Sequence, residues 1–160
     1  MQDAANLAGR DKERRILVAV DESEHSKRAV MYLADFFGDY PDVHLKLLAI
    51  VPWPAEDYFA TDEERERWGQ EKIATLERKL DEYKEMLVEA GFAESRVDKL
   101  LSVSKHASIA DAILEEQERL RCCIVAVGRR GIDRHEEFIH GSTSNRILHH
   151  AKNCAVMVIE

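Results

Sequence analysis

Cysteine and long apolar runs are scarce in this 160-residue sequence, and each shortage narrows the classes of protein to which the chain can belong. The cysteines Cys122, Cys123 and Cys154 lie inside apolar runs without a C-x-x-C spacing, which favours buried thiols in a reducing cytoplasm. No run reaches the roughly 18 apolar residues of a membrane span. The segment 1–13 lacks the apolar core of a signal peptide. We therefore expect a cytoplasmic protein.

Negative charge outweighs positive charge, with 31 Asp and Glu against 23 Lys and Arg and a net charge of −8. This balance argues against nonspecific binding to nucleic acid or to an anionic membrane. It does not exclude an anionic ligand held by local N–H groups. A chain of this length buries roughly 68–70% of its unfolded surface as one domain. We expect a flexible polar arm over 1–13 and a single domain over 14–160.

Short apolar runs alternate along the chain with amphipathic helical patterns. The runs predict strands, because strands buried on both faces of a parallel sheet are continuously apolar; they are 16–20, 43–51, 97–103, 123–127 and 155–159. Helices are predicted after the capping hydroxyls of Ser23, Thr61 and Ser108, and from Ser142. Five strands alternating with four helices predict an α/β fold with one doubly wound, Rossmann-like parallel sheet.

The helix after Thr61 carries a heptad stripe that permits two interpretations. Its apolar residues repeat at alternating spacings of three and four: Ile73, Leu76, Leu80, Tyr83 and Leu87. Such a stripe is typical of a coiled-coil dimer, but packing against the sheet explains it as well. The stripe spans only about two to three heptads, so we favour packing against the sheet.

The most informative feature is a glycine-rich stretch that follows the fourth predicted strand. Gly128 and Gly131 end that strand, and nine residues later Gly141-Ser142-Thr143 opens the last helix. Glycine lets backbone approach a ligand closely, and a helix N-terminus attracts phosphate oxygens. Alternatively, the glycines only turn the chain and Ser142 only caps a helix. Asp21 ends the first strand, and doubly wound sheets bind ligands at this edge, which favours a phosphate site.

Two segments resemble universal stress proteins. The strand Ile16-Leu17-Val18-Ala19-Val20-Asp21 with Glu22-Ser23 looks like the opening of that family. The pattern Gly128-x2-Gly131-x9-Gly141-Ser142 matches the glycine signature of its ATP-binding branch, and the similarity covers nearly all of 14–160. The resemblance implies the sheet order 3-2-1-4-5, a homodimer joined through the last strand, and ATP at the switch point between strands one and four. Magnesium or manganese would bridge the phosphates.

The resemblance also implies roles for individual residues. Ala19 and Asp21 would lie by the adenine and ribose, Ile50 would contact the adenine, and Val127 would meet the sugar or base. Arg129 and Arg130, in the two-residue gap, either pair with phosphate charge or are solvated. The residues implied around the phosphates come from the glycine-rich stretch: Gly128, Arg130, Gly131, Gly141, Ser142 and Thr143.

Two departures from the family pattern motivate a second hypothesis: Glu22 stands where a glycine is common, and the segment 133–137 is more charged than usual. In a third departure, Lys105 or His106 replaces the usual glycine before the third helix, so the resemblance is weaker in that loop. Added negative charge beside the pocket would raise the electrostatic cost of a bound triphosphate. The alternative is therefore a nucleotide-independent, dimeric protein-interaction module of the same fold.

No set of residues marks a catalytic or metal site. The seven histidines form no metal-binding set, and no general base has an evident orienting partner. A receiver domain would need an aspartate ending the third strand, which 101–104 lacks, and the acids of 21–24 would repel the phosphate of a flavin. We expect a stress-response sensor or regulator with an unidentified protein partner, and at most a slow ATPase.

Overall fold

The computed structural model describes residues 14–105, 108–129 and 142–160. Within these ranges, strands and helices alternate along the chain as predicted, and strand boundaries differ from the predicted ones by two residues or fewer. The predicted N-terminal arm, 1–13, lies outside the described residues. The elements are β1 (Arg14–Ala19), α2 (Glu24–Phe37), β2 (Val43–Pro52), α3 (Asp62–Glu89), the 3-10 turn η1 (Glu94–Arg96), β3 (Val97–Ser104), α4 (Ile109–Leu120), β4 (Ile124–Gly128), α5 (Ser142–His150) and β5 (Ala155–Ile159).

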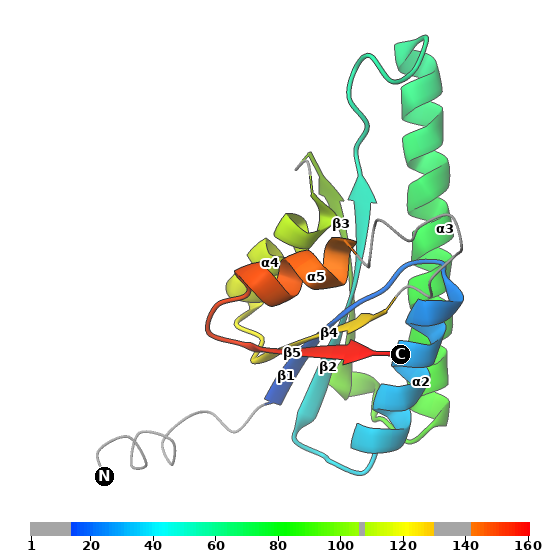
Figure 1. The fold of residues 1–160 in the computed structure, drawn as a ribbon. Coiled ribbons are helices and arrows are strands. Elements are labelled where there is room, and N and C mark those ends of the chain that lie inside the picture. The colour runs from blue at the N-terminus through cyan, green and yellow to red at the C-terminus, as the bar shows by residue number, and fades with distance from the viewer. Residues whose placement is uncertain (1–13, 106–107, 130–141) are drawn as a thin grey trace.

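The five strands form one parallel sheet in the order β3-β2-β1-β4-β5. Helices α2 and α3 cover one face and α4 and α5 cover the other (Figure 1). This arrangement confirms the predicted doubly wound fold and the strand order that the family resemblance implies. The direction of winding reverses between β1 and β4, so the carboxyl ends of these two strands form the topological switch point.

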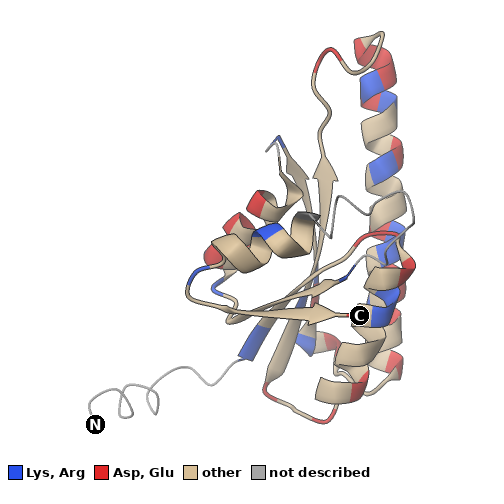
Figure 2. Ribbon diagram, in the orientation of Figure 1, with Lys and Arg blue, Asp and Glu red and all other residues tan. Residues whose placement is uncertain are grey.

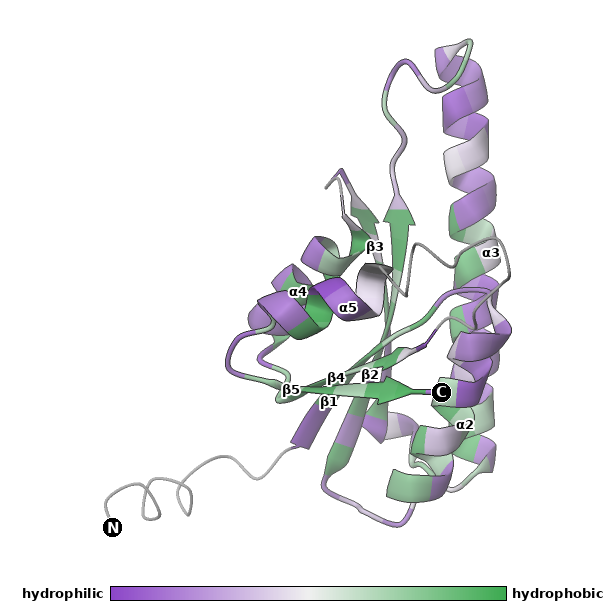
Figure 3. Ribbon diagram, in the orientation of Figure 1, coloured by the Kyte–Doolittle hydropathy of each residue, from purple (hydrophilic) through white to green (hydrophobic). Residues whose placement is uncertain are grey.

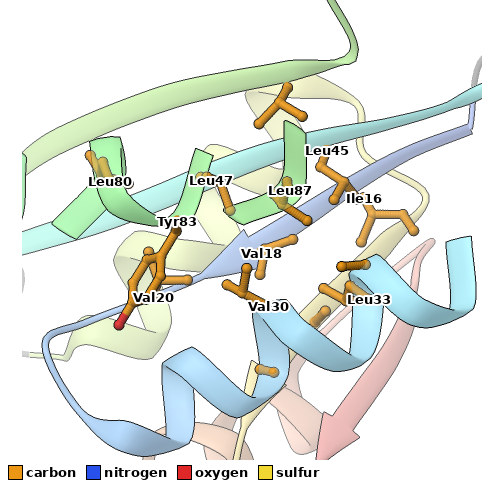
Figure 4. Close-up of a cluster of buried hydrophobic side chains, with 14 of the residues drawn as sticks. Ile16, Val18, Val20, Val30, Leu33, Leu45, Leu47, Leu80, Tyr83 and Leu87 are labelled. Carbon is orange, nitrogen blue, oxygen red and sulfur yellow. The ribbon is translucent and has the colours of Figure 1, made fainter. Parts of the chain in front are cut away.

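A hydrophobic cluster fills each face of the sheet, which explains why the strands are continuously apolar. In β1, Ile16 and Val18 face α2 and α3, while Leu17 between them faces α4 and α5. Figure 3 shows the apolar colouring concentrated along the strands, and Figure 4 shows the side chains of the first cluster meeting between β1, β2, α2 and α3. Charged residues lie mainly on the helices (Figure 2). The strands therefore position the site through a rigid, buried scaffold.

The heptad stripe of α3 packs against the sheet. Leu76, Leu80, Tyr83 and Leu87 are all buried in the first cluster, and Ile73 packs against it. The interpretation favoured from the sequence is therefore confirmed, and these side chains are not available to a coiled-coil partner. The N-terminal half of α3 extends past the end of β2, beside the loop that follows that strand (Figure 1).

The helix ends follow local sequence signals. Ser23, Thr61 and Ser108 each accept a hydrogen bond from the backbone N–H three residues later, as the caps predicted. Gly91 follows α3 with φ of +115°, a conformation that other residues rarely adopt. Because these signals depend on neighbouring residues only, sequence alone suffices to find them.

The cysteines differ from the prediction that all are buried. Cys122 is buried, and burial raises the pKa of its thiol to about 11. Cys154 is half-buried, but Cys123 is exposed, so the prediction was wrong for Cys123. Cys123 precedes β4, and its thiol donates to the carbonyl of Arg15 at 3.2 Å instead of entering the core. Among the described residues, no helix is long and apolar enough to cross a membrane.

Candidate functional site

A cavity lies at the switch point, where β1, β2 and β4 end and the first turns of α2, α4 and α5 begin. Its volume is about 90 Å³, and it opens to solvent. This is below the roughly 300–1,000 Å³ of most ligand pockets. The lining residues are Ala19, Val20, Asp21, Ser23, His25, Ser26, Leu48, Ile50, Ile109, Ile113, Val127, Gly128, Thr143 and Ser144.

The cavity brings together most of the site residues predicted in the described part of the chain. Six predicted residues line it: Ala19, Asp21, Ile50, Val127, Gly128 and Thr143. Ser142 is the first residue of α5, next to Thr143. Arg130, Gly131 and Gly141 lie outside the described residues. Residues from four separated segments therefore meet at one sheet edge, which the strand ends and the start of the last predicted helix signalled in the sequence.

The cavity is lined by both aliphatic and polar side chains. Ile50, Ile113 and Val127 come from β2, α4 and β4 and present aliphatic surface, which suits a flat heterocycle. Thr143 and Ser144 lie in the first turn of α5, where the positive end of the helix dipole favours an anion. The aliphatic residues therefore suit a base, and the start of α5 suits a phosphate.

Asp21 is held by a compact hydrogen-bond network in the loop between β1 and α2. Its carboxylate oxygen Oδ1 accepts from the backbone N–H of Ser23 and from the hydroxyl of Ser26, each at 2.8 Å. The backbone N–H of Asp21 donates to the same Ser26 oxygen at 2.8 Å. Ser26 is buried and lines the cavity, yet the sequence analysis missed it. Its place in the first turn of α2, three residues after the capping Ser23, is the signal that could have identified it.

Helix α3 holds the same loop from the opposite side. The hydroxyl of Tyr83 donates to the backbone carbonyl of Asp21 at 2.9 Å. Burial, together with the nearby carboxylate of Asp21, raises the pKa of Tyr83 to about 12. Tyr83 therefore remains a neutral donor at every physiological pH.

Glu22 does not line the cavity, and its carboxylate pairs with the ammonium group of Lys72 on α3. The negative charge expected beside the pocket is thus directed away from it and compensated. Arg129 also turns away, since its guanidinium pairs with Glu160 and its backbone N–H donates to Ile159 at 2.7 Å. Of the departures noted in the sequence, Glu22 therefore no longer argues against an anionic ligand.

Gly128 has a packing reason to be glycine. A Cβ at this position would lie 2.7 Å from the backbone oxygen of His25, in the first turn of α2. The close approach of β4 to α2 requires the missing side chain whether or not a ligand binds. His25 and Ser26, which the glycine allows to approach, also line the cavity. Within the described residues, no cluster of three or more His, Cys, Asp or Glu side chains could hold a metal ion.

The model of the Universal stress protein family matches residues 13–160, nearly the whole chain. The chain belongs to the universal stress protein family. Comparison with curated protein sequences gives no match. The family assignment therefore rests on the family model, and solved structures support its fold.

Several solved family members share the fold. The universal stress protein UspA from Lactobacillus plantarum superposes with a TM-score of 0.77 at 18% identity, covering 94% of this chain and 100% of that one. A family member from Arabidopsis thaliana with AMP bound gives 0.65 at 21%, covering 91% and 90%. One from Archaeoglobus fulgidus in complex with dAMP gives 0.64 at 18%, covering 92% and 98%. At these identities the likeness shows a common fold.

Proposed function

We propose that this chain binds ATP at the β1/β4 switch point and acts as a cytoplasmic stress-response sensor or regulator, with at most slow hydrolysis. The observation that carries the proposal is the cavity that unites Asp21, Ile50, Val127 and Thr143 at that edge. Family members from Arabidopsis thaliana and Archaeoglobus fulgidus hold AMP and dAMP, which supports an adenine nucleotide as the ligand.

The proposed pose follows the polarity of the cavity. The adenine would lie between Ile50 and Val127, and Ala19 and Asp21 would face the sugar. The phosphates would lie against the start of α5, at Ser142 and Thr143, with Gly128, Arg130, Gly131 and Gly141 completing their surroundings. A magnesium or manganese ion would be held mainly by the phosphates, because Mg²⁺ keeps several waters and needs few protein ligands.

The proposal includes a homodimer formed through β5. This strand lies at the edge of the sheet, so one row of its backbone N–H and C=O groups has no strand partner among the described residues. Its residues Val156, Met157 and Val158 are half-buried. The neighbouring helix α2 carries two exposed aromatic rings, those of Tyr32 and Phe36, which stack on each other with their centres 5.9 Å apart. A second copy would pair with the edge strand and cover apolar surface.

One observation favours the alternative, a protein-interaction module that uses no nucleotide. The cavity of about 90 Å³ is smaller than ligand pockets usually are. Under this hypothesis the glycine at 128 would be retained for packing against His25 alone. The unidentified protein partner would then bind elsewhere on the surface.

Calorimetric titration of Mg-ATP into nucleotide-stripped protein tests the proposal. Micromolar binding is expected, with strong weakening in Thr143→Val and in Gly141→Val, because both changes affect the phosphate end. Thr75→Val, in the middle of α3 and outside the cavity lining, is the matched control and should bind as the wild type does. Absence of binding heat at several temperatures would favour the interaction module. Steady-state phosphate release then measures whether any hydrolysis exceeds background.

A further inference from the structure

Two side chains of α3 reach the loop between β1 and α2, whose residue Asp21 faces the cavity. Tyr83 donates its hydroxyl hydrogen to the carbonyl oxygen of Asp21 at 2.9 Å, and Lys72 pairs with Glu22. The two α3 residues are separated by about three helical turns and so lie on the same side of the helix. Figure 4 shows the ring of Tyr83 beside Val20, the residue that precedes this loop. Two successive residues of the loop are thus tied to one helix.

The tyrosine hydroxyl has a role that packing alone does not explain. Tyr83 is only 1% exposed and lies in the core cluster, where a phenylalanine would fill the same space. A buried hydroxyl needs a partner, and here the partner is the loop carbonyl. The bond fixes the peptide plane between Asp21 and Glu22, which also sets the direction in which the Asp21 side chain leaves the backbone.

The loop is therefore held from two sides. Ser26 of α2 binds the backbone N–H and the carboxylate of Asp21, while Tyr83 of α3 binds its carbonyl. Lys72 adds an ion pair at the next residue, and this pair is partly exposed to solvent. Neither Tyr83 nor Lys72 lines the cavity. Any effect of these two residues on a ligand must be transmitted through Asp21 and Glu22.

We propose that Tyr83 and Lys72 are positioning residues of the nucleotide site, acting through the backbone of Asp21 and the carboxylate of Glu22. The proposal rests on the proposed nucleotide binding. It means that α3 controls the geometry of the site, although this helix supplies no residue to the cavity lining. A movement of α3 relative to the sheet would change the orientation of Asp21 and hence the affinity for the ligand. The long helix would in this way couple its exposed surface to the site.

Three variants separate positioning from bulk stability. Tyr83→Phe removes only the hydroxyl and should weaken Mg-ATP binding about 2- to 10-fold, the range of one net hydrogen bond. Lys72→Glu should weaken it by about 2- to 5-fold or more, since an exposed pair is replaced by repulsion. The charge exchange Lys72→Glu with Glu22→Lys should restore most of the affinity. Tyr58→Phe, at an exposed position, and Lys84→Glu, which breaks an ion pair with Glu94 instead of one with the loop, serve as matched controls.

Amide hydrogen exchange of the ligand-free proteins is measured beside the titrations. The proposal requires that the backbone amides of residues 22–26 exchange hydrogen faster in Tyr83→Phe and in Lys72→Glu, while those of β4 keep their wild-type rates. In the double variant Lys72→Glu with Glu22→Lys, the rates at 22–26 should return toward those of the wild type. A merely structural role would instead accelerate exchange throughout the core. If the wild type binds Mg-ATP and both variants show the same affinity and the same amide hydrogen exchange as the wild type, the positioning role is overturned and the proposed function stands. Failure of the wild type to bind overturns the proposed function, and the positioning role falls with it.

Discussion

Gly128 lies directly against the first turn of α2, so close that a Cβ would stand 2.7 Å from the backbone oxygen of His25 and 2.9 Å from its carbonyl carbon. Real side chains do not tolerate such contacts with backbone, and α2 would have to shift. We expect Gly128→Ala to lower the free energy of unfolding by about 1–3 kcal/mol, the usual cost of overpacking. Urea denaturation without nucleotide measures this effect.

The same variant separates the two interpretations of the glycine signature. A loss of stability without ligand means that packing against His25 is sufficient reason for the glycine. An unchanged denaturation midpoint would contradict this prediction and return Gly128 to a role in ligand binding alone. Gly128→Ser should behave like Gly128→Ala, because the added Cβ causes the contact in both.

Hydrogen bonds between residues close in the sequence were predictable, and hydrogen bonds or ion pairs between residues far apart in the sequence were not. The caps at Ser23, Thr61 and Ser108 each bind a backbone group three residues away, so a local pattern reveals them. The bond from Tyr83 to Asp21 joins residues separated by 62 positions, and the Lys72–Glu22 pair joins residues separated by 50. No periodicity encodes such pairs.

The predicted site followed the same division. Asp21 and Gly128 could be placed at one edge because parallel strands end together, and both line the cavity. His25, Ser26 and Ile109 were missed, since their access to the cavity depends on how the first turns of α2 and α4 approach the sheet. The charge of Glu22 was misjudged as a feature of the pocket because Lys72, its partner, belongs to a distant helix.

The raised pKa of Tyr83 predicts that the stability of the folded protein depends on pH in the alkaline range. Its pKa in the folded protein is about 12, above the ordinary value of 10.0, so the folded state holds the phenolic proton more tightly than the unfolded state. The stabilisation is complete below pH 10 and is lost as the pH rises from 10 to 12. By linkage, a shift of this size contributes about 2–3 kcal/mol. We expect the free energy of unfolding to fall by that order over this range.

Tyr83→Phe should remove this component, and urea denaturation at closely spaced pH values measures it. Because lysines also titrate in this range, the informative quantity is the difference between the wild type and Tyr83→Phe at each pH. Tyr58→Phe is the control, since Tyr58 is strongly exposed. A wild-type curve parallel to that of Tyr83→Phe from pH 9 to 12 would contradict the prediction.

Arg96 predicts a large effect on stability from a conservative change. Its buried guanidinium donates to three backbone carbonyls, those of Gly38 at 3.1 Å, Val43 at 3.2 Å and Tyr40, and lies 4.4 Å from the ring centre of Phe92. A lysine keeps the charge but cannot reproduce the planar fork. We expect Arg96→Lys to cost about 2–3 kcal/mol, the range for bonds to a charged group.

Chemical denaturation tests the role of Arg96 against Arg78→Lys, an exposed position on α3 that should change stability by less than about 0.5 kcal/mol. Arg96→Met, which keeps the apolar stem, should cost at least as much as Arg96→Lys because all three carbonyls lose the donor. Equal stability of Arg96→Lys and the wild type would show that charge alone is sufficient at this position.

Replacing Gly69 by alanine should change the stability of the protein in a direction that depends on Trp53. It lies inside α3, where glycine costs about 1 kcal/mol relative to alanine. An added Cβ would lie 2.6 Å from Cη2 of Trp53 and closer still to Cζ3, so the indole occupies the space that alanine would need. Gly69→Ala should therefore be neutral or destabilising in the wild type, because the gain in helix propensity is offset by displacement of Trp53. In Trp53→Ala, the same change should stabilise the protein by about 1 kcal/mol. A double-mutant cycle by urea denaturation measures the coupling, and additive effects of the two changes would contradict a direct contact between the helix and the indole.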